Sequence, residues 1–351
     1  MLWPNMMFAP KKFVFQALKE TLAMKKFEVV MIGNTAVGKT SMLATLSNEL
    51  DSYNLAGKIT IKPTSDEFRI LQEQWNEMVD QVESEGPFTT LATGIEGNLV
   101  DFVEHEFDFN VDGKKEAHVV FTDTRGGMTG TLDDELVRRV NESFGVFCVV
   151  DASVLMECTE AVNLRFNCPK FIRELLQRVY TDGDGRQPRF VAFILTKCES
   201  YMDRAENRKE LLNKFQSVFQ DTLGLLQKMP SPPNLHVLAI QTMTCVRFFR
   251  LQESQISKEK VDGSKTAIKV KLPVFRVLPN NKLKTKDCAY PLVIMLQELI
   301  EATRSKGGGV LKTILNLLGL GQKDLTAYLD EVGRHVKVPL LYKKWAKGGQ
   351  T

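Results

Sequence analysis

The stretch Gly33-Asn34-Thr35-Ala36-Val37-Gly38-Lys39-Thr40 decides the fold, because it fits the phosphate-binding loop pattern G-x-x-x-x-G-K-[ST] at every fixed position. An apolar, β-rich run at 27–32 precedes it and a helix-like run at 40–50 follows it. This strand–loop–helix order is the one that such a loop requires. The alternative is an ordinary glycine-rich turn, and the full match together with its context favours the binding loop.

The chemistry of the loop gives each residue an expected role. We expect Gly33 and Gly38 to adopt backbone angles that other residues avoid, so that successive N–H groups form a nest for phosphate oxygens. The N-terminus of the next helix adds positive partial charge. Lys39 is expected to reach the β- and γ-phosphates, and the Thr40 hydroxyl to ligate Mg²⁺. The expected nucleotide contacts are therefore Gly33, Asn34, Thr35, Ala36, Val37, Gly38, Lys39, Thr40 and Ser41.

The composition is that of a globular protein, with 351 residues of which 43% are hydrophobic and 25% charged. The net charge of +3 is too small to indicate specific binding of nucleic acid. The six cysteines form no C-x-x-C pair, so we expect them to be reduced residues of a cytoplasmic protein. The four scattered histidines suggest no metal site built from histidine side chains. No apolar run is long enough to span a membrane, and the first residues lack the layout of a signal peptide.

Alternating apolar strands and helices predict an α/β fold with a mostly parallel sheet that is covered on both faces. Asp112-Gly113 predicts a hairpin that makes one edge of the sheet antiparallel. The expected strands are 27–32, 99–110, 116–122, 145–151, 190–196 and 235–241. The expected helices are 12–26, 40–50, 65–84, 131–143, 169–180, 205–228 and 290–304.

Two further motifs follow apolar strands. The run VVFTDTRGG at 119–127 contains D-x-x-G, in which Asp123 can hold Mg²⁺ through a water and the Gly126 N–H can approach the γ-phosphate. The run TKCE at 196–199 is similar to the guanine-specifying pattern [NT]-K-x-D. In it, the Lys197 stem can lie over the purine, and the Glu199 carboxylate can accept from guanine, a donor pair that adenine lacks. Each motif could also be a plain turn or a charged strand end.

Together, GNTAVGKT, DTRGG and TKCE resemble the Ras-like P-loop GTPases over residues 27–303. The hairpin before Asp123 resembles the translation-factor-related (TRAFAC) class, and the long insertions resemble bacterial GTPases encoded as pairs. The resemblance implies a domain at 27–304 with insertions at 51–97 (helical, containing the first switch) and 246–282 (β-rich). A helical amphipathic extension at 1–26 and a helical tail at 305–351 flank it.

The resemblance also implies further site residues. A switch threonine that closes on Mg²⁺ and the γ-phosphate is sought among Thr89, Thr90 and Thr93, and the P-x-x-T pattern at 87–90 favours Thr90. The expected metal ligands are thus Thr40, Thr90 and Asp123, and the expected catalytic residues are Lys39 and Thr90. A base-contacting loop is expected at 242–244, beginning with Thr242, although it departs from the usual Ser-Ala-Lys.

Gly127 stands where Ras-type enzymes place a glutamine that orients the attacking water. We therefore expect a GTP-binding switch that hydrolyses GTP to GDP slowly and with help from a partner protein or a second GTPase. A nucleotide-dependent scaffold with little hydrolysis is the alternative, and an ATPase or small-molecule kinase is a third possibility. The apolar segment 310–320 either packs on its own domain or contacts a partner or a membrane surface.

Overall fold

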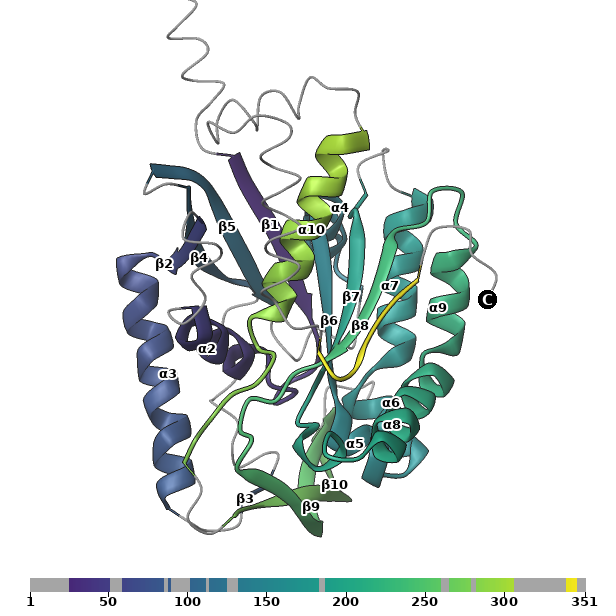
Figure 1. Ribbon diagram of the computed structural model, residues 1–351. Coiled ribbons are helices and arrows are strands. Elements are labelled where there is room, and N and C mark those ends of the chain that lie inside the picture. The colour runs from purple at the N-terminus through teal and green to yellow at the C-terminus, as the bar shows by residue number, and fades with distance from the viewer. Residues whose placement is uncertain are drawn as a thin grey trace, which may run out of the picture.

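The computed structural model describes residues 25–50, 59–84, 88–89, 102–111, 114–124, 132–182, 187–259, 265–278, 282–305 and 339–345. Within these residues an eight-stranded sheet has the order β11-β8-β7-β6-β1-β5-β4-β2 (Figure 1). Its parallel strands are β1 (Lys25–Ile32), β5 (Lys114–Thr124), β6 (Gly145–Asp151), β7 (Phe190–Thr196) and β8 (Asn234–Ala239). Its antiparallel pairings involve β4 (Phe102–Val111), β2 (Ile59–Pro63) and β11 (Tyr342–Trp345).

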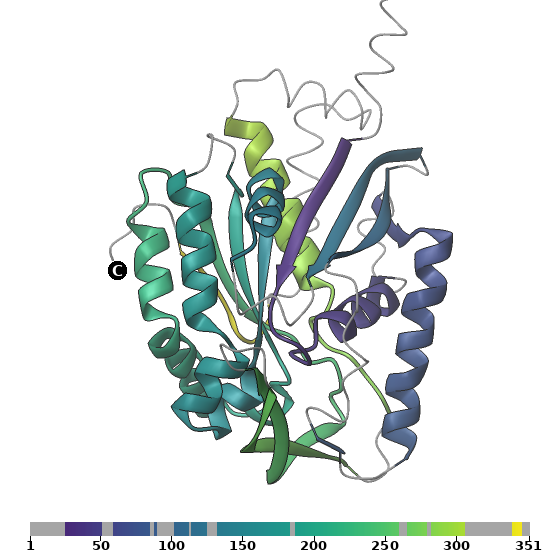
Figure 2. The same ribbon diagram turned by 180° about the vertical axis from the view of Figure 1, so that it is seen from behind.

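Helices cover both faces of this sheet, as the alternation of elements predicts (Figures 1 and 2). One face packs on α2 (Lys39–Leu50), α3 (Ser65–Glu83) and α10 (Tyr290–Ser305). The other packs on α4 (Asp134–Glu142), α5 (Ala152–Glu157), α7 (Pro169–Asp182), α8 (Ala205–Val218) and α9 (Gln220–Gln227), with α6 (Glu160–Phe166) beside α5. The strands β6, β7 and β8 are buried along their whole length, and their sequences are accordingly mostly apolar, with the buried polar residues Asn234 and His236 in β8 as exceptions.

The α/β fold class, the mostly parallel sheet and the antiparallel hairpin of β4 and β5 are confirmed. The expected helix 205–228 is instead two helices that meet at Phe219. The ring of Phe219 is fully buried and lies 5.2 Å from that of Phe193 and 5.1 Å from that of Phe215. The change of direction at Phe219 is accompanied by the burial of this ring in the core, and helical periodicity alone does not reveal it.

A second sheet lies at the end of the molecule where the parallel strands of the first sheet finish (Figure 1). It has the order β3-β10-β9 and consists of β3 (Phe88–Thr89), β10 (Lys265–Val277) and β9 (Val246–Glu259). The β-rich character expected for 246–282 is therefore present as a long hairpin. The short strand β3 comes from the segment expected to contain the first switch.

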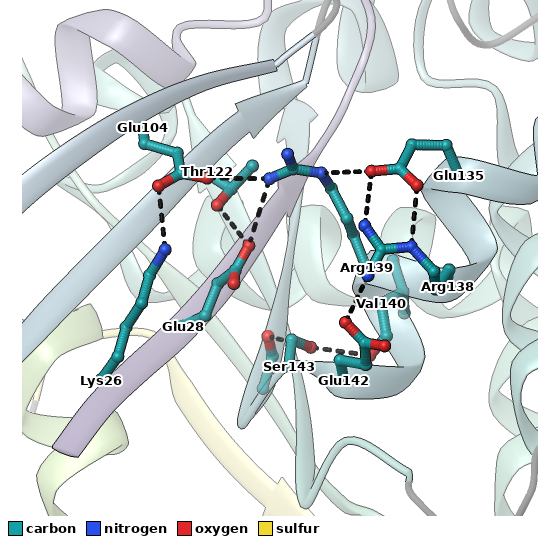
Figure 3. Close-up of polar contacts among 11 residues, drawn as sticks. Lys26, Glu28, Glu104, Thr122, Glu135, Arg138, Arg139, Val140, Glu142 and Ser143 are labelled. Atoms are coloured by element: carbon teal, nitrogen blue, oxygen red, sulfur yellow. Dashed lines mark hydrogen bonds and ion pairs between the residues drawn. The ribbon is translucent and has the colours of Figure 1, made fainter.

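Helix α4 is joined to the sheet by a network of charged side chains around Arg139 (Figure 3). The Arg139 guanidinium donates to Glu104 on β4 at 2.9 Å and to Glu135 on its own helix at 2.9 Å. It also lies 4.6 Å from the centre of the Phe102 ring. Lys26 on β1 forms a second ion pair with Glu104 at 2.9 Å. The network connects β1, β4 and α4 at an exposed surface, where such pairs contribute little to stability.

The far edge of the sheet differs from expectation, because residues 342–345 fall in the part of the chain expected to be a helical tail. They form β11, which pairs antiparallel with β8. Lys344 Nζ lies 3.1 Å from the fully buried Glu298 carboxylate on α10, and His236 Nε2 lies 3.0 Å from the same oxygen. The ion pair between Lys344 on β11 and Glu298 on α10 joins distant segments, so the sequence of the tail alone does not predict it.

The buried cluster around Glu298 leads to a prediction about stability and pH. Burial by itself would raise the pKa of Glu298, but hydrogen bonds from His236 and Asn234 and the charge of Lys344 outweigh it and lower the pKa. A depressed folded-state pKa stabilises the fold above the unfolded pKa, and this contribution is lost as the pH falls through the folded value. We expect Glu298→Gln to lower the free energy of unfolding by about 1–3 kcal/mol at pH 7.

The difference in the free energy of unfolding between the wild type and Glu298→Gln should become smaller in acid, below the ordinary carboxyl pKa of 4.5. Urea unfolding at a series of pH values measures it, with the exposed Glu210→Gln as a control that should show no gap. A difference in stability that stays constant from neutral to acid pH would contradict the lowered pKa of Glu298.

The segments 1–24 and 310–320, which include the expected N-terminal helix and the apolar segment, lie outside the described residues. Among the helices that the structure describes, none has the length and apolar character needed to cross a bilayer. All six cysteines lie in described segments and have free thiols.

Candidate functional site

The candidate site lies at one edge of the central sheet, where β1, β5, β6, β7 and β8 end. Ligands of open α/β sheets bind at this carboxyl edge. The loop 33–38 follows β1 directly and runs into α2, which begins at Lys39. The strand–loop–helix order expected from the sequence is therefore present.

Two residues of the loop have left-handed backbone angles. Gly38 has φ of 96° and Ala36 has φ of 62°. Gly38 thus has the conformation expected of it, whereas Gly33 is not among the described glycines with positive φ. A Cβ atom on Gly33 would lie 2.9 Å from the backbone oxygen of Val149 on β6. The expectation that Gly33 adopts a positive φ is therefore wrong. A glycine fits at this position because a side chain would collide with the backbone of β6.

Lys39 folds back over its own loop. Its Nζ donates to the backbone oxygens of Gly33 at 2.8 Å and Asn34 at 3.1 Å, and it lies 3.7 Å from Asp123 Oδ1. Burial lowers the pKa of Lys39, and the nearby Asp123 charge opposes this effect. A phosphate group would supply the anionic partner that favours the charged form of this lysine.

Thr40 and Asp123, predicted as metal ligands, lie side by side. The Thr40 hydroxyl donates to Asp123 Oδ2 at 3.2 Å, and the other oxygen of Asp123 is buried and accepts no hydrogen bond within the described residues. Burial raises the pKa of Asp123, against the charges of Lys39 and His105. A buried carboxylate oxygen without a donor, beside a hydroxyl, fits a hard cation such as Mg²⁺.

The described residues contain no group of three His, Cys, Asp or Glu side chains that could hold a metal. A cation at Asp123 would therefore draw its remaining ligands from Thr40, from phosphate oxygens and from water. This donor set is the one that Mg²⁺ uses with bound nucleotides.

The TKCE motif contacts the phosphate-binding loop from β7. The Thr196 hydroxyl donates to the Val37 backbone oxygen at 2.5 Å and to Val150 at 3.2 Å. Lys197, with φ of 53°, donates through Nζ to the Ala36 backbone oxygen. The two motifs, which are far apart in the sequence, thus form one structural unit.

Asp151, at the end of β6, is a site residue that the sequence analysis missed. Its Oδ2 lies 2.9 Å from Lys197 Nζ, and its Oδ1 accepts from the Val154 N–H at 3.0 Å and so caps α5. The Asn167 side chain in turn exchanges hydrogen bonds with the Asp151 backbone. An aspartate at the end of an apolar strand was a visible signal, since Asp123 was found in the same way.

Glu199 lies opposite the loop expected to contact the base. Its Oε1 accepts from the Met243 N–H at 3.1 Å and lies 3.5 Å from the Thr242 hydroxyl. Burial raises the pKa of Glu199, and hydrogen bonds from the backbone of its own residue and of the 242–243 loop oppose this effect. The structure therefore brings Glu199 and Thr242 together, as the motifs imply.

The remaining predicted residues have simpler positions or lie outside the described part. The Asn34 amide donates to the Arg165 backbone oxygen at 3.0 Å and to Cys168 Sγ. Its Oδ1 accepts from the Thr35 N–H at 2.8 Å, and Ser41 lies in the first turn of α2. Thr90, Gly126 and Gly127 lie outside the described residues, so their roles remain predictions.

Comparisons with known proteins give no family for this chain. No protein-family model matches it, and no curated protein matches it. Among solved structures, the GTPase-like domain of S. cerevisiae Ski7, bound to GTP, is similar with a TM-score of 0.38 and 10% sequence identity. The match covers 67% of this chain, and this chain spans only 45% of that structure. The interpretation of the site therefore rests on its own geometry.

Proposed function

We propose that this protein binds guanine nucleotides with Mg²⁺ and acts as a switch that hydrolyses GTP slowly. One observation carries the proposal: the three motifs meet at one edge of the sheet. Thr196 and Lys197 contact the phosphate-binding loop, Asp123 contacts Thr40, and Glu199 contacts the 242–243 loop. An arrangement built only for stability would not require three nucleotide-type motifs to converge.

Each part of the site has a role in this proposal. The loop N–H groups and Lys39 hold the phosphates, while Thr40 and Asp123 hold Mg²⁺, which neutralises phosphate charge when bound. Lys197 lies over the purine and Glu199 accepts from guanine. Thr90 closes on the γ-phosphate and Gly126 senses it. The strand order, with antiparallel β4 beside β5, supports a member of the TRAFAC class.

Hydrolysis is expected to be slow because Gly127 has no side chain to orient the attacking water. A partner protein or a second GTPase would then supply the missing group, in the cytoplasm. The same residue favours the second candidate, a nucleotide-dependent scaffold with little turnover. Phosphate release from GTP in the presence and absence of cell lysate separates the two, since a rate that stays at background with every addition supports the scaffold.

The test of the proposed function is a comparison of fluorescent mant-GDP, mant-GTP and mant-ATP titrations in the presence of Mg²⁺. We expect tight binding of both guanine nucleotides and at least about 100-fold weaker binding of mant-ATP, as sites built for specific hydrogen bonds discriminate strongly. Equal affinities for guanine and adenine would contradict the guanine assignment, and an ATPase or kinase would then be favoured.

A further inference from the structure

The second sheet lies between two parts of the candidate site. On one side, the Phe248 N–H of β9 donates to the Ser200 hydroxyl at 2.6 Å, in the short helix Glu199–Tyr201 that carries the base-specifying carboxylate. On the other side, β10 pairs with β3, so that Val274 is opposite Thr89. Thr90, the proposed switch threonine, directly follows β3 in the chain. The described strands β9 and β10 (246–259 and 265–277), here called the ribbon, thus contact both the helix Glu199–Tyr201 and the strand that precedes Thr90.

The described part of the ribbon is held firmly against the domain. Leu272 is fully buried in a cluster with Val154 on α5 and Phe166 on α6. Arg247 at the start of β9 pairs with Asp203 at 3.1 Å. Of the two strands of the ribbon, β10 pairs directly with β3, so the ribbon and β3 belong to one sheet.

The ribbon also concentrates positive charge. Its two strands, 246–259 and 265–277, contain seven Lys or Arg and two Asp or Glu, a net charge of +5, whereas the whole chain carries +3. The rest of the chain is therefore slightly acidic. Charge concentrated on one element attracts an anionic partner in a way that the small total charge does not suggest.

An exposed aromatic residue organises two of these charges. The Phe249 side chain is 42% exposed, and the guanidinium carbons of Arg276 and Arg250 lie 4.3 and 5.4 Å from the centre of its ring. Within the described residues neither guanidinium has a carboxylate within ion-pair distance. A guanidinium held over a ring keeps its N–H edge available for bidentate binding of a carboxylate.

This geometry favours a peptide over a nucleic acid. Single-stranded nucleic acids bind by stacking their bases on open aromatic rings, and the Phe249 ring is already occupied by guanidinium groups. The guanidinium edges that remain available match paired carboxylate oxygens as well as phosphate, and an acidic peptide needs no open ring on which to stack.

We propose that the ribbon is the docking surface for an acidic segment of a partner protein, with Arg250 and Arg276 as its anchors. Through β3 and Ser200, the affinity for this segment depends on which nucleotide is bound. This second part rests on the proposed function, and the docking surface itself does not.

The test uses the full chain and a fluorescein-labelled peptide rich in glutamate and aspartate, measured by fluorescence anisotropy. We expect binding by the wild type and at least about 10-fold weaker binding by Arg250→Glu/Arg276→Glu, since each charge reversal replaces attraction by repulsion. Arg250→Gln/Arg276→Gln, which is less disruptive, should show an intermediate loss. The charge-matched control Lys214→Glu/Lys228→Glu changes an exposed lysine of α8 and the exposed lysine that follows α9, and it should bind as the wild type does.

Equal peptide binding by the wild type and both arginine variants would overturn the docking surface. Tight binding of labelled polyuridine RNA or of phosphatidylserine vesicles without binding of the peptide would also overturn it, in favour of that other class of partner. A further titration compares the GDP-bound protein with the protein bound to a non-hydrolysable GTP analogue, and we expect the peptide affinity to differ by at least about 5-fold, the low end of allosteric coupling.

The two proposals fail in distinguishable ways. Equal peptide affinity in both nucleotide states would remove the coupling. Absence of any mant-GDP binding would contradict the proposed function. The peptide titration without nucleotide would still test whether the ribbon is a docking surface. Normal mant-GDP binding by the arginine variants is expected, because neither arginine contacts the phosphate-binding loop.

Discussion

Lys39→Ala is expected to weaken mant-GDP binding by roughly 100-fold, the loss associated with a charge-assisted contact to phosphate. The Nζ of Lys39 is buried, donates to the loop carbonyls of Gly33 and Asn34 and lies 3.7 Å from Asp123 Oδ1. Phosphate oxygens are better partners for a buried ammonium than neutral carbonyls. Alanine removes this interaction and leaves the backbone of the loop unchanged.

The measurement is a mant-GDP titration of Lys39→Ala beside Lys214→Ala, which removes an exposed lysine of α8 and should bind normally. Thermal unfolding without nucleotide checks the fold. Alanine also leaves Asp123 without the ammonium that lies 3.7 Å from its Oδ1, so this check of the fold is needed. A folded Lys39→Ala protein with full nucleotide affinity would refute the phosphate-binding assignment of the loop.

Glu199→Gln is expected to weaken guanine nucleotide binding by roughly 10- to 100-fold, the range for a hydrogen bond to a charged group. The substitution keeps a carbonyl oxygen that can accept from the Met243 N–H, which now bonds to Glu199 Oε1. The 242–243 loop should therefore stay in place. What is lost is one acceptor for the N1–H and N2–H₂ pair of guanine.

The same substitution should raise the affinity for xanthine nucleotides, because the glutamine amide can donate to the C2 carbonyl that xanthine has in place of the guanine amino group. Competition of GDP, XDP and ADP against mant-GDP measures the change, and Glu206→Gln, an exposed carboxylate in the first turn of α8, is the matched control. An unchanged preference among the three bases would show that Glu199 does not contact the base.

Much of this site could be predicted from the sequence, because its motifs are local. The loop pattern fixes a glycine with positive φ, a lysine and a hydroxyl within eight consecutive residues, and a strand end fixes the direction of Asp123 or Glu199. Those patterns depend on neighbouring residues only. Asp151 has the same local signal as Asp123, the end of an apolar strand, but its contact with Lys197, 46 residues further along the chain, is not visible in the neighbouring residues.

In two places the sequence predicted the right residues or element but gave the wrong physical reason or boundary. A Cβ on Gly33 would lie 2.9 Å both from the Val149 backbone oxygen on β6 and from the Val37 side chain, and the loop sequence alone does not show that β6 lies so close. The break at Phe219 arises in the same way, since the apolar residues of 205–228 follow a helical period on both sides of it. The packing of its ring against Phe193 is a tertiary contact.

The sequence by itself determined the fold class, a mostly parallel α/β sheet, and it placed three nucleotide-type motifs at strand ends, each encoded within a few consecutive residues. Only the tertiary structure decided that Thr196 and Lys197 support the loop, that β11 completes the sheet edge and that β3 pairs with the ribbon. The physical reason is that hydrogen-bond pairing between distant segments leaves no periodic pattern in either segment. Such pairing depends on which strand edges and buried charges the rest of the fold leaves without a partner.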